Sequence, residues 1–138
     1  MRRYLLDTNI LSHLIKQPQS VVAQKVSNLE RDVFCTSAIV ACELRYGVEK
    51  KGSVKLTEKV ELLLSQIDVL PLEHPAVSLH YGQLRAFLEQ RGQIIGSNDM
   101  LIAAHALALD VVLVTDNVDE FKRVPQLQIE NWLLLNEV

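Results

Sequence analysis

Residues 3–9 read Arg-Tyr-Leu-Leu-Asp-Thr-Asn, a short apolar run of the kind that forms a buried strand, and the run stops on the carboxylate of Asp7. A charge at the end of such a strand indicates a functional site, because burying an unpaired carboxylate is costly. The alternative is a helix N-cap, since a helical pattern begins near Ile10. Thr8 or Asn9 can fill that capping role instead.

Further apolar segments follow this stretch, and we expect each to form a strand. The expected strands cover residues 3–6, 33–36, 68–72 and 111–115, with a weaker one over 127–132. Their continuous Val, Ile and Leu content is typical of parallel strands covered on both faces. The sequence therefore predicts one α/β domain, residues 1–138, with three layers and a central, mainly parallel sheet. Ligands bind such sheets beyond the carboxyl ends of the strands, where Asp7 and Asp116 stand.

Apolar residues at helical spacing fill the intervals between the expected strands. Four such stripes are present. The first ends before Pro18, the second continues on a following helix, and the fourth lies on a helix that Gly92 closes. The stripes consist of Ile10, Leu11, Leu14 and Ile15; Val22, Val26 and Leu29; Leu56, Val60, Leu63, Leu64 and Ile67; and Val77, Tyr81, Leu84 and Leu88.

Three further acids lie in settings comparable to that of Asp7. Glu43 lies on a helical face of mostly apolar character, where an ion pair with Arg45 or another arginine is the structural alternative. Asp99 opens an alanine-rich helix, whose dipole alone explains an acid there. Asp116 follows Val-Val-Leu-Val-Thr, where a turn explains it. One divalent cation explains all the acids at once, whereas the structural alternatives must each hold separately.

The candidate metal ligands and catalytic residues are therefore Asp7, Glu43, Asp99 and Asp116. Carboxylates gathered in a low dielectric repel one another and stay ionised only with a cation bound. Oxygen ligands indicate Mg²⁺ or Mn²⁺ rather than zinc. Such an ion lowers the pKa of a bound water, which attacks a phosphodiester while the ion neutralises charge on the phosphate. The acids thus predict metal-dependent phosphodiester hydrolysis without a protein nucleophile.

The composition limits the class of protein. The chain has 138 residues, is 49% hydrophobic and carries a net charge of −3, which argues against wholesale electrostatic attraction to nucleic acid but not against a nucleic-acid enzyme. No apolar run approaches the roughly 20 residues that span a bilayer, and no signal peptide is evident. We expect a cytoplasmic protein with no membrane partner. The spacing of Cys35 and Cys42 fits neither a zinc pair nor a redox pair, and we interpret both as buried free thiols.

The remaining polar candidates are weaker. The histidines (His13, His74, His80 and His105) show no metal-binding pattern, and we interpret them as surface or helix-packing residues. His105, six positions after Asp99, is the one that can lie near the rim of the site. The basic side chains that can grip RNA phosphates, with solvated helix faces as their alternative role, are Arg45, Lys50, Lys51, Arg85 and Arg91.

At these residues the chain resembles the PIN-domain ribonucleases and, among them, the VapC toxins of bacterial toxin–antitoxin pairs. The resemblance covers nearly the whole length, and the order and spacing of its motifs carry it. The matching stretches are Leu-Leu-Asp-Thr-Asn at 5–9, Cys-Glu-Leu-Arg-Tyr-Gly at 42–47, Ile-Gly-Ser-Asn-Asp-Met-Leu-Ile-Ala-Ala-His at 95–105, and Val-Thr-Asp-Asn with Phe121 and Arg-Val-Pro at 123–125.

The resemblance implies a three-layer α/β/α PIN-like fold in which Asp7, Glu43 and Asp99 bind the metal, with Thr8 or Asn9 supporting Asp7. The fourth position departs from the family pattern. A Thr-x-Asp motif is common there and would fall on Asn117, whereas this chain has Asp116 one residue earlier. Either Asp116 reaches the metal or Asn117 holds a water or phosphate in place of an acid.

The resemblance also implies endoribonuclease activity, inhibition of translation, a homodimer, and a VapB-like antitoxin whose tail enters the acidic cleft. Ile95-Gly96 and the Phe-x-Arg-Val-Pro ending resemble the VapC branch that cuts initiator tRNA in the anticodon loop. The alternative is a catalytically weak PIN-fold module that binds RNA or protein, which the shifted fourth acid suggests. A signalling receiver domain is disfavoured, because Leu70-Pro71-Leu72 supplies no acceptor aspartate after the third strand.

Overall fold

The computed structural model describes residues 3–136, which fold around a five-stranded sheet in the order β3-β2-β1-β4-β5. Every pairing between neighbouring strands is parallel. The strands are β1 (Tyr4–Leu6), β2 (Phe34–Ser37), β3 (Asp68–Leu70), β4 (Val112–Val114) and β5 (Ile129–Glu130). The predicted α/β class and mainly parallel sheet are therefore confirmed.

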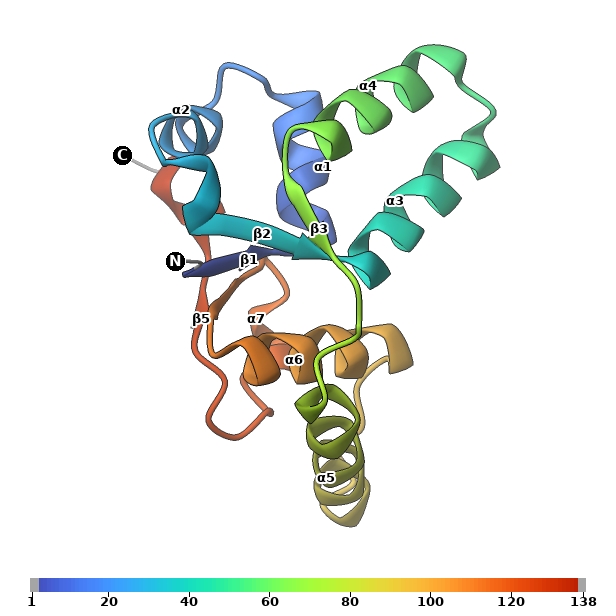
Figure 1. The fold of residues 1–138 in the computed structure, drawn as a ribbon, viewed down its shortest axis with the longest axis vertical. Coiled ribbons are helices and arrows are strands. Elements are labelled where there is room, and N and C mark those ends of the chain that lie inside the picture. The colour runs from blue at the N-terminus through green and yellow to red at the C-terminus, as the bar shows by residue number, and fades with distance from the viewer. Residues whose placement is uncertain (1–2, 137–138) are drawn as a thin grey trace.

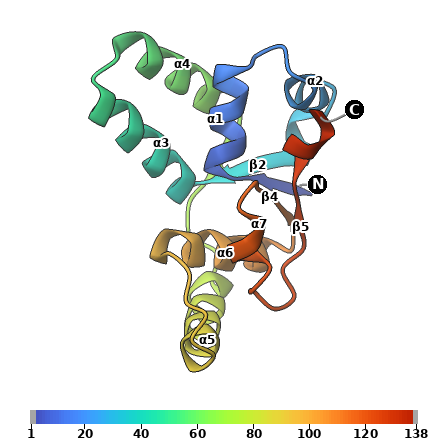
Figure 2. The ribbon, with the colours of Figure 1, turned by 180° about the vertical axis from the view of Figure 1, so that it is seen from behind.

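Helices cover both faces of the sheet and make the predicted three layers (Figure 1). One face carries α1 (Thr8–Lys16), α2 (Val21–Ser27), α3 (Ala38–Lys51) and α4 (Val54–Ser65). The other carries α5 (Ala76–Gln90), α6 (Ser97–Leu109) and the short α7 (Val118–Phe121), which lies beside α6 in the reverse view (Figure 2). Two 3₁₀ helices, η1 (Arg31–Val33) and η2 (Trp132–Asn136), complete the elements. None of the described helices is long and apolar enough to cross a membrane.

The strand order reverses its direction between β1 and β4. The chain runs outward from β1 through β2 to β3, then returns across the sheet to β4, which pairs with β1 in the register Leu6 opposite Val114. The carboxyl ends of β1 and β4 are therefore adjacent, and Asp7 and Thr115 follow them directly. A reversal of this kind leaves a crevice beyond the strand ends, which is where α/β sheets bind ligands.

The predicted elements match the observed ones to within a few residues, with two differences in the stripes. Leu29 and Ile67 lie beyond the ends of α2 and α4, although Leu29 packs on the core and Ile67 is buried within it. Both connections pack against the core, so an apolar residue continues the helical spacing after the helix has ended. The weak last strand is shorter than predicted, because Gln126 has a positive φ of 67° and Trp132 begins a 3₁₀ helix.

The core lies on both faces of the central strands, with Leu5, Leu113 and Phe121 fully buried. Cys35 is buried as predicted, but the prediction that Cys42 is buried is wrong. The buried residues of α3 recur at Val40, Leu44 and Val48, and that face packs against α1 and α4. Cys42 lies off this face and is exposed.

Candidate metal centre

Asp7 is held at the end of β1 by three hydrogen bonds. Its Oδ1 accepts from the backbone N–H of Thr8 at 2.8 Å, and its Oδ2 accepts from the Thr115 hydroxyl at 2.7 Å and the Asn9 amide at 3.4 Å. Asp7 therefore caps α1, so the structural alternative is confirmed, while its role as a metal ligand stays a prediction. Burial raises the pKa of Asp7, the bonds from Thr115 and Thr8 lower it in part, and the charge of Glu43 raises it further.

Asn9 ties together the loops that follow β1 and β4. Its Nδ2 donates to the Thr115 hydroxyl at 3.3 Å, and its Oδ1 accepts from the backbone N–H of Asp116 at 2.9 Å. The expected support of Asp7 by its neighbours is thus present in the structure. Because Asn9 bonds Asp7 and both residues of the opposite loop, the carboxylate has a fixed direction into the crevice.

Glu43 projects from α3 toward the amino end of α1. Its Oε1 accepts a hydrogen bond from the Thr8 hydroxyl at 2.5 Å. The alternative of an ion pair with Arg45 is wrong, because that guanidinium makes two 2.9 Å hydrogen bonds to Glu61. Glu43 therefore faces the Asp7 end of the crevice.

Asp99 lies in the first turn of α6, as the sequence predicts. Burial, then a hydrogen bond with Glu120 and the charges of Asp7, Glu120 and Glu43, raise its pKa to about 7. The pKa of Glu120 is lowered, first by the Asn117 amide, which donates to it at 3.0 Å, and then by Asp99. The pair is therefore arranged for a protonated Asp99 to donate to an ionised Glu120, as neighbouring carboxylates do when no cation separates them.

Asp116, the fourth predicted ligand, lies in a different environment. Its side chain is exposed, and its Oδ1 accepts from the Asn131 amide at 2.9 Å. Asp116 is not among the charges that raise the pKa of Asp7 or Asp99, whereas Glu120 is. The structure thus brings Asp7, Glu43 and Asp99 together and adds Glu120, while Asp116 points elsewhere. Its role as a ligand stays a prediction.

Glu120 was not among the predicted ligands, because the prediction relied on an acid close to the end of β4, where Asp116 lies. The chain instead begins α7 at Val118, and one helical turn carries the carboxylate to the crevice. The available signal was the spacing of Asn117 and Glu120, three residues apart, which places both on the same side of a helical turn. Asn117, the other predicted candidate for the fourth position, orients Glu120 through its amide.

The donor atoms of this centre fit a hard divalent cation. All four side chains offer carboxylate oxygens, which suit Mg²⁺ or Mn²⁺. Burial first, and then the neighbouring acids, raise the pKa of Asp99. As the side chains are placed here, no three His, Cys, Asp or Glu residues between residues 3 and 136 converge to coordination distance. The donor chemistry fits the ion.

Asp99→Asn is expected to raise the melting temperature of the metal-free protein at pH 8 and to change it little near pH 4. The pKa of Asp99 is about 7 in the folded chain and about 4 when unfolded, so the folded chain binds more protons between these values. Stability therefore falls as pH rises through this window. Solvent screening of the half-buried group limits the effect to about 1 kcal/mol, or a few degrees.

Melting curves of both proteins in EDTA, from pH 4 to pH 8, measure this effect. The other titrating groups, including His105, whose pKa burial lowers, occur in both proteins and largely cancel in the difference. A difference in melting temperature that stays constant across this range would contradict the assigned pKa.

A buried bond between Ser37 and His105 joins the two helices that carry Glu43 and Asp99. The His105 Nδ1 and the Ser37 hydroxyl are 2.8 Å apart, and both residues are fully buried. The same hydroxyl accepts from the backbone N–H of Ile39 and so caps α3. The predicted helix-packing role of His105 is confirmed, in the interior rather than at the rim.

Ser37→Ala is expected to lower the free energy of unfolding by about 1–2 kcal/mol, because it removes the cap of α3 and leaves both ring nitrogens of His105 without a partner. Urea unfolding measures the change. Ser78→Ala, on the exposed side of α5, is the control and should be neutral. Equal stabilities for the two variants would show that the buried bond contributes nothing.

Comparison with known proteins agrees with this geometry. The PIN domain family matches residues 4–127. Ribonuclease VapC2 of Rickettsia felis is 42% identical over 131 residues, covering 94% of this chain and 97% of the relative. The tRNA(fMet)-specific endonuclease VapC of Shigella flexneri is 38% identical over 133 residues, covering 96% and 99%.

Solved structures lead to the same family. The crystal structure of VapBC2 from Rickettsia felis bound to a DNA fragment from its promoter superposes with a TM-score of 0.87 at 40% identity, covering 96% of this chain and 99% of that one. VapBC-1 from nontypeable Haemophilus influenzae gives a TM-score of 0.82 at 38% identity, with the same coverage. The chain therefore belongs to the PIN-domain ribonucleases, in the VapC toxin family of toxin–antitoxin systems.

Proposed function

We propose that this VapC-family chain is a Mg²⁺- or Mn²⁺-dependent endoribonuclease that acts in the cytoplasm and is held inactive by a VapB-like antitoxin. The observation that carries the proposal is the placement of acids that follow β1 or lie on α3 and α6 around the crevice where the strand order reverses. These acids lie far apart in sequence, yet in addition to burial the charge of Glu43 raises the pKa of Asp7, and the charges of Asp7 and Glu43 raise the pKa of Asp99. Gathering them without a functional reason would destabilise the fold.

The side chains have distinct roles in this proposal. Asp7, Glu43, Asp99 and Glu120 hold the ion, and Asp116 is replaced by Glu120. The ion supplies an activated water and neutralises charge on the scissile phosphate. Thr115 and Asn9 fix the direction of Asp7, and Asn117 fixes that of Glu120. Hydrogen bonds from neighbouring side chains to the ligands keep the ligands oriented before the ion binds.

Incubation of the purified protein with total RNA tests the activity. We expect internal cleavage with Mg²⁺ or Mn²⁺, loss of cleavage in EDTA, and recovery when Mn²⁺ is added in excess. Cleavage that survives chelation would refute the metal-dependent mechanism.

The substrate we propose is initiator tRNA, cut in the anticodon loop with consequent inhibition of translation. Support comes from the Shigella flexneri relative, whose name specifies tRNA(fMet). End-mapping of total tRNA after a short incubation should show one dominant cut in that loop. Uniform fragmentation of all tRNAs would exclude this specificity while leaving the ribonuclease activity intact.

We propose that the antitoxin inserts side chains into a cavity of about 210 Å³ between α1, α3 and α4, which reaches Glu43. Its wall combines Ile15 and Val48 with Lys16 and Lys51. Relatives such as VapBC-1 were solved as toxin–antitoxin pairs, which supports a similar partner here.

We also propose a homodimer, which light scattering after gel filtration should detect as twice the chain mass.

The competing proposal is a PIN-fold module that binds RNA or protein without cutting. The observation that favours it is the bond between Glu43 and the Thr8 hydroxyl, which occupies an oxygen needed for the ion. RNA binding without any turnover at saturating Mn²⁺ would support the module over the enzyme.

A further inference from the structure

A basic hollow of about 370 Å³ lies where the end of α5 meets the segment after α7. It is lined by Phe87, Arg91, Gln93, Lys122, Arg123 and Pro125. We propose that this basic hollow binds the phosphate backbone of the RNA, beside the bond that is cut. The inference rests on the proposed ribonuclease function and names the surface that holds its substrate.

Three cations gather in the hollow, although the chain as a whole carries a net charge of −3. The Arg91 guanidinium stacks over the Phe87 ring at 4.3 Å, a contact that orients the charge without neutralising it. Arg123 donates to the backbone carbonyl of Ile94 at 3.3 Å, which likewise leaves its charge in place. Lys122 makes a 3.5 Å ion pair with Asp119, whose side chain is 91% exposed, so the pair is worth little in water.

The basic hollow adjoins the acidic centre through two segments of chain. Arg123 follows Glu120 by three residues, and its backbone N–H donates to the Glu120 carbonyl at 3.1 Å. Its partner Ile94 lies in the loop between α5 and α6, which leads to Asp99. A phosphate chain that approaches the acids is repelled by them, so cations at the adjoining surface are needed to hold it. Stacked arginine beside an aromatic ring is also a typical contact for single-stranded RNA.

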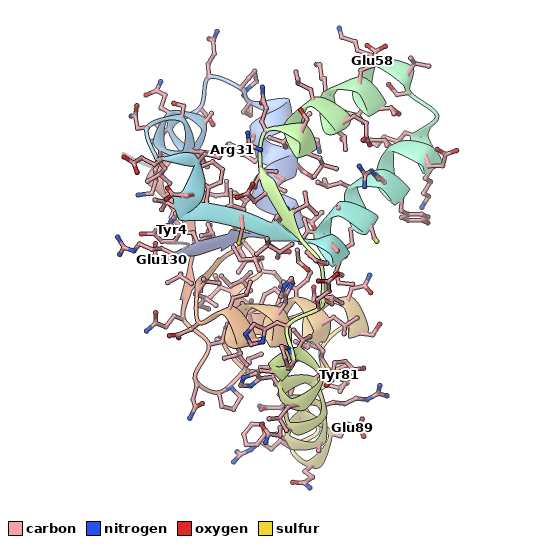
Figure 3. The ribbon with its side chains drawn as sticks, viewed as in Figure 1. Tyr4, Arg31, Glu58, Tyr81, Glu89 and Glu130 are labelled. Carbon is pink, nitrogen blue, oxygen red and sulfur yellow. The ribbon has the colours of Figure 1, made fainter. Side chains whose placement is uncertain are left out.

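Two of the basic residues that the sequence offers for RNA binding are already engaged elsewhere. Arg45 makes its bidentate pair with Glu61 on the other face of the molecule. Arg85 bonds Glu89 at 2.7 Å and the Tyr81 hydroxyl at 3.0 Å, and both partners are labelled on α5 in Figure 3. Arg91 remains the candidate on α5 and lines the hollow. Replacing Arg45 and Arg85 together therefore provides a control that changes the net charge by the same amount as replacing two cations of the hollow.

The test measures RNA binding by fluorescence anisotropy in the Asp7→Asn background, which prevents cleavage. A labelled single-stranded RNA of anticodon-loop sequence is titrated over a series of salt concentrations against Arg91→Ala/Lys122→Ala and the matched control Arg45→Ala/Arg85→Ala. Arg123 is left intact because its bond to Ile94 supports the loop. Thermal melts confirm that both double variants fold.

We expect the hollow variant to bind roughly tenfold more weakly near physiological salt, with a salt slope reduced by about 1.4, the value for two lost phosphate contacts on a single strand. The control should bind as the background protein does. Equal affinities for the two double variants would overturn the inference. Wild-type protein that neither binds nor cuts RNA would instead refute the proposed function, so the two failures are distinguishable.

Discussion

Asp7→Asn is expected to reduce metal-dependent RNA cleavage by at least about 100-fold, since losing only a residue that hydrogen-bonds a metal ligand already costs about 10–100-fold. The substitution removes the negative charge at the centre of the crevice. It keeps an acceptor for the Thr8 N–H, and asparagine is as good an N-cap as aspartate. The chain should therefore stay folded, and the loss should come from the ion and not from the scaffold.

Initial rates on labelled tRNA at saturating Mn²⁺, with melting temperatures measured in parallel, test this expectation. Asp119→Asn, which removes an exposed acid from the neighbouring α7, is the control and should cut as the wild type does. Full activity of the Asp7 variant would remove the metal centre from the mechanism. Equal losses in both variants would indicate a general effect of charge.

Glu120→Gln is expected to lower cleavage by at least about tenfold, whereas Asp116→Asn should leave it nearly unchanged. Glu120 shares a hydrogen bond with Asp99 and is oriented by Asn117. Asp116 is exposed, and its Oδ1 accepts from the amide of Asn131, which follows β5. Both substitutions remove one negative charge from the same short segment. A difference between them therefore comes from the position of the acid and not from the change in net charge.

Rates over a Mn²⁺ series give both the apparent metal affinity and the maximal rate for this pair. Weaker activation by Mn²⁺ in the Glu120 variant would identify Glu120 as the fourth ligand. The reverse pattern, with the Asp116 variant impaired and the Glu120 variant active, would restore Asp116 to the site and show that its loop moves when the ion binds.

Much of the scaffold was predictable from the sequence because it depends on local patterns. Continuous apolar runs fixed the strands and their burial, as at Leu5 and Leu113, which are fully enclosed. Asp7 follows from the same reasoning, since a residue directly after a central parallel strand reaches the carboxyl edge of the sheet. Asp99 was predictable in the same way, because the first turn of a helix that leads into a parallel strand lies at the carboxyl edge of the sheet.

The features that the sequence does not predict depend on which way side chains face once the helices and strands have packed. Asp116 and Glu120 lie four residues apart, and only the start of α7 decides which of them faces the crevice. Cys42 follows buried Ala41 on α3, and it is exposed because a different side of this helix packs against the core. Glu43 is a predicted ligand, but its bond to Thr8 depends on the distance between α1 and α3, which no local pattern encodes.

Acids from distant parts of the chain are proposed to share one divalent ion, and a crystal of the protein soaked in Mn²⁺ shows whether they do. Anomalous scattering should show a peak between Asp7 and Asp99, with Glu43 and Glu120 turned toward it. A crystal at saturating Mn²⁺ with no peak in this crevice, or with a peak held by other residues, would contradict the account.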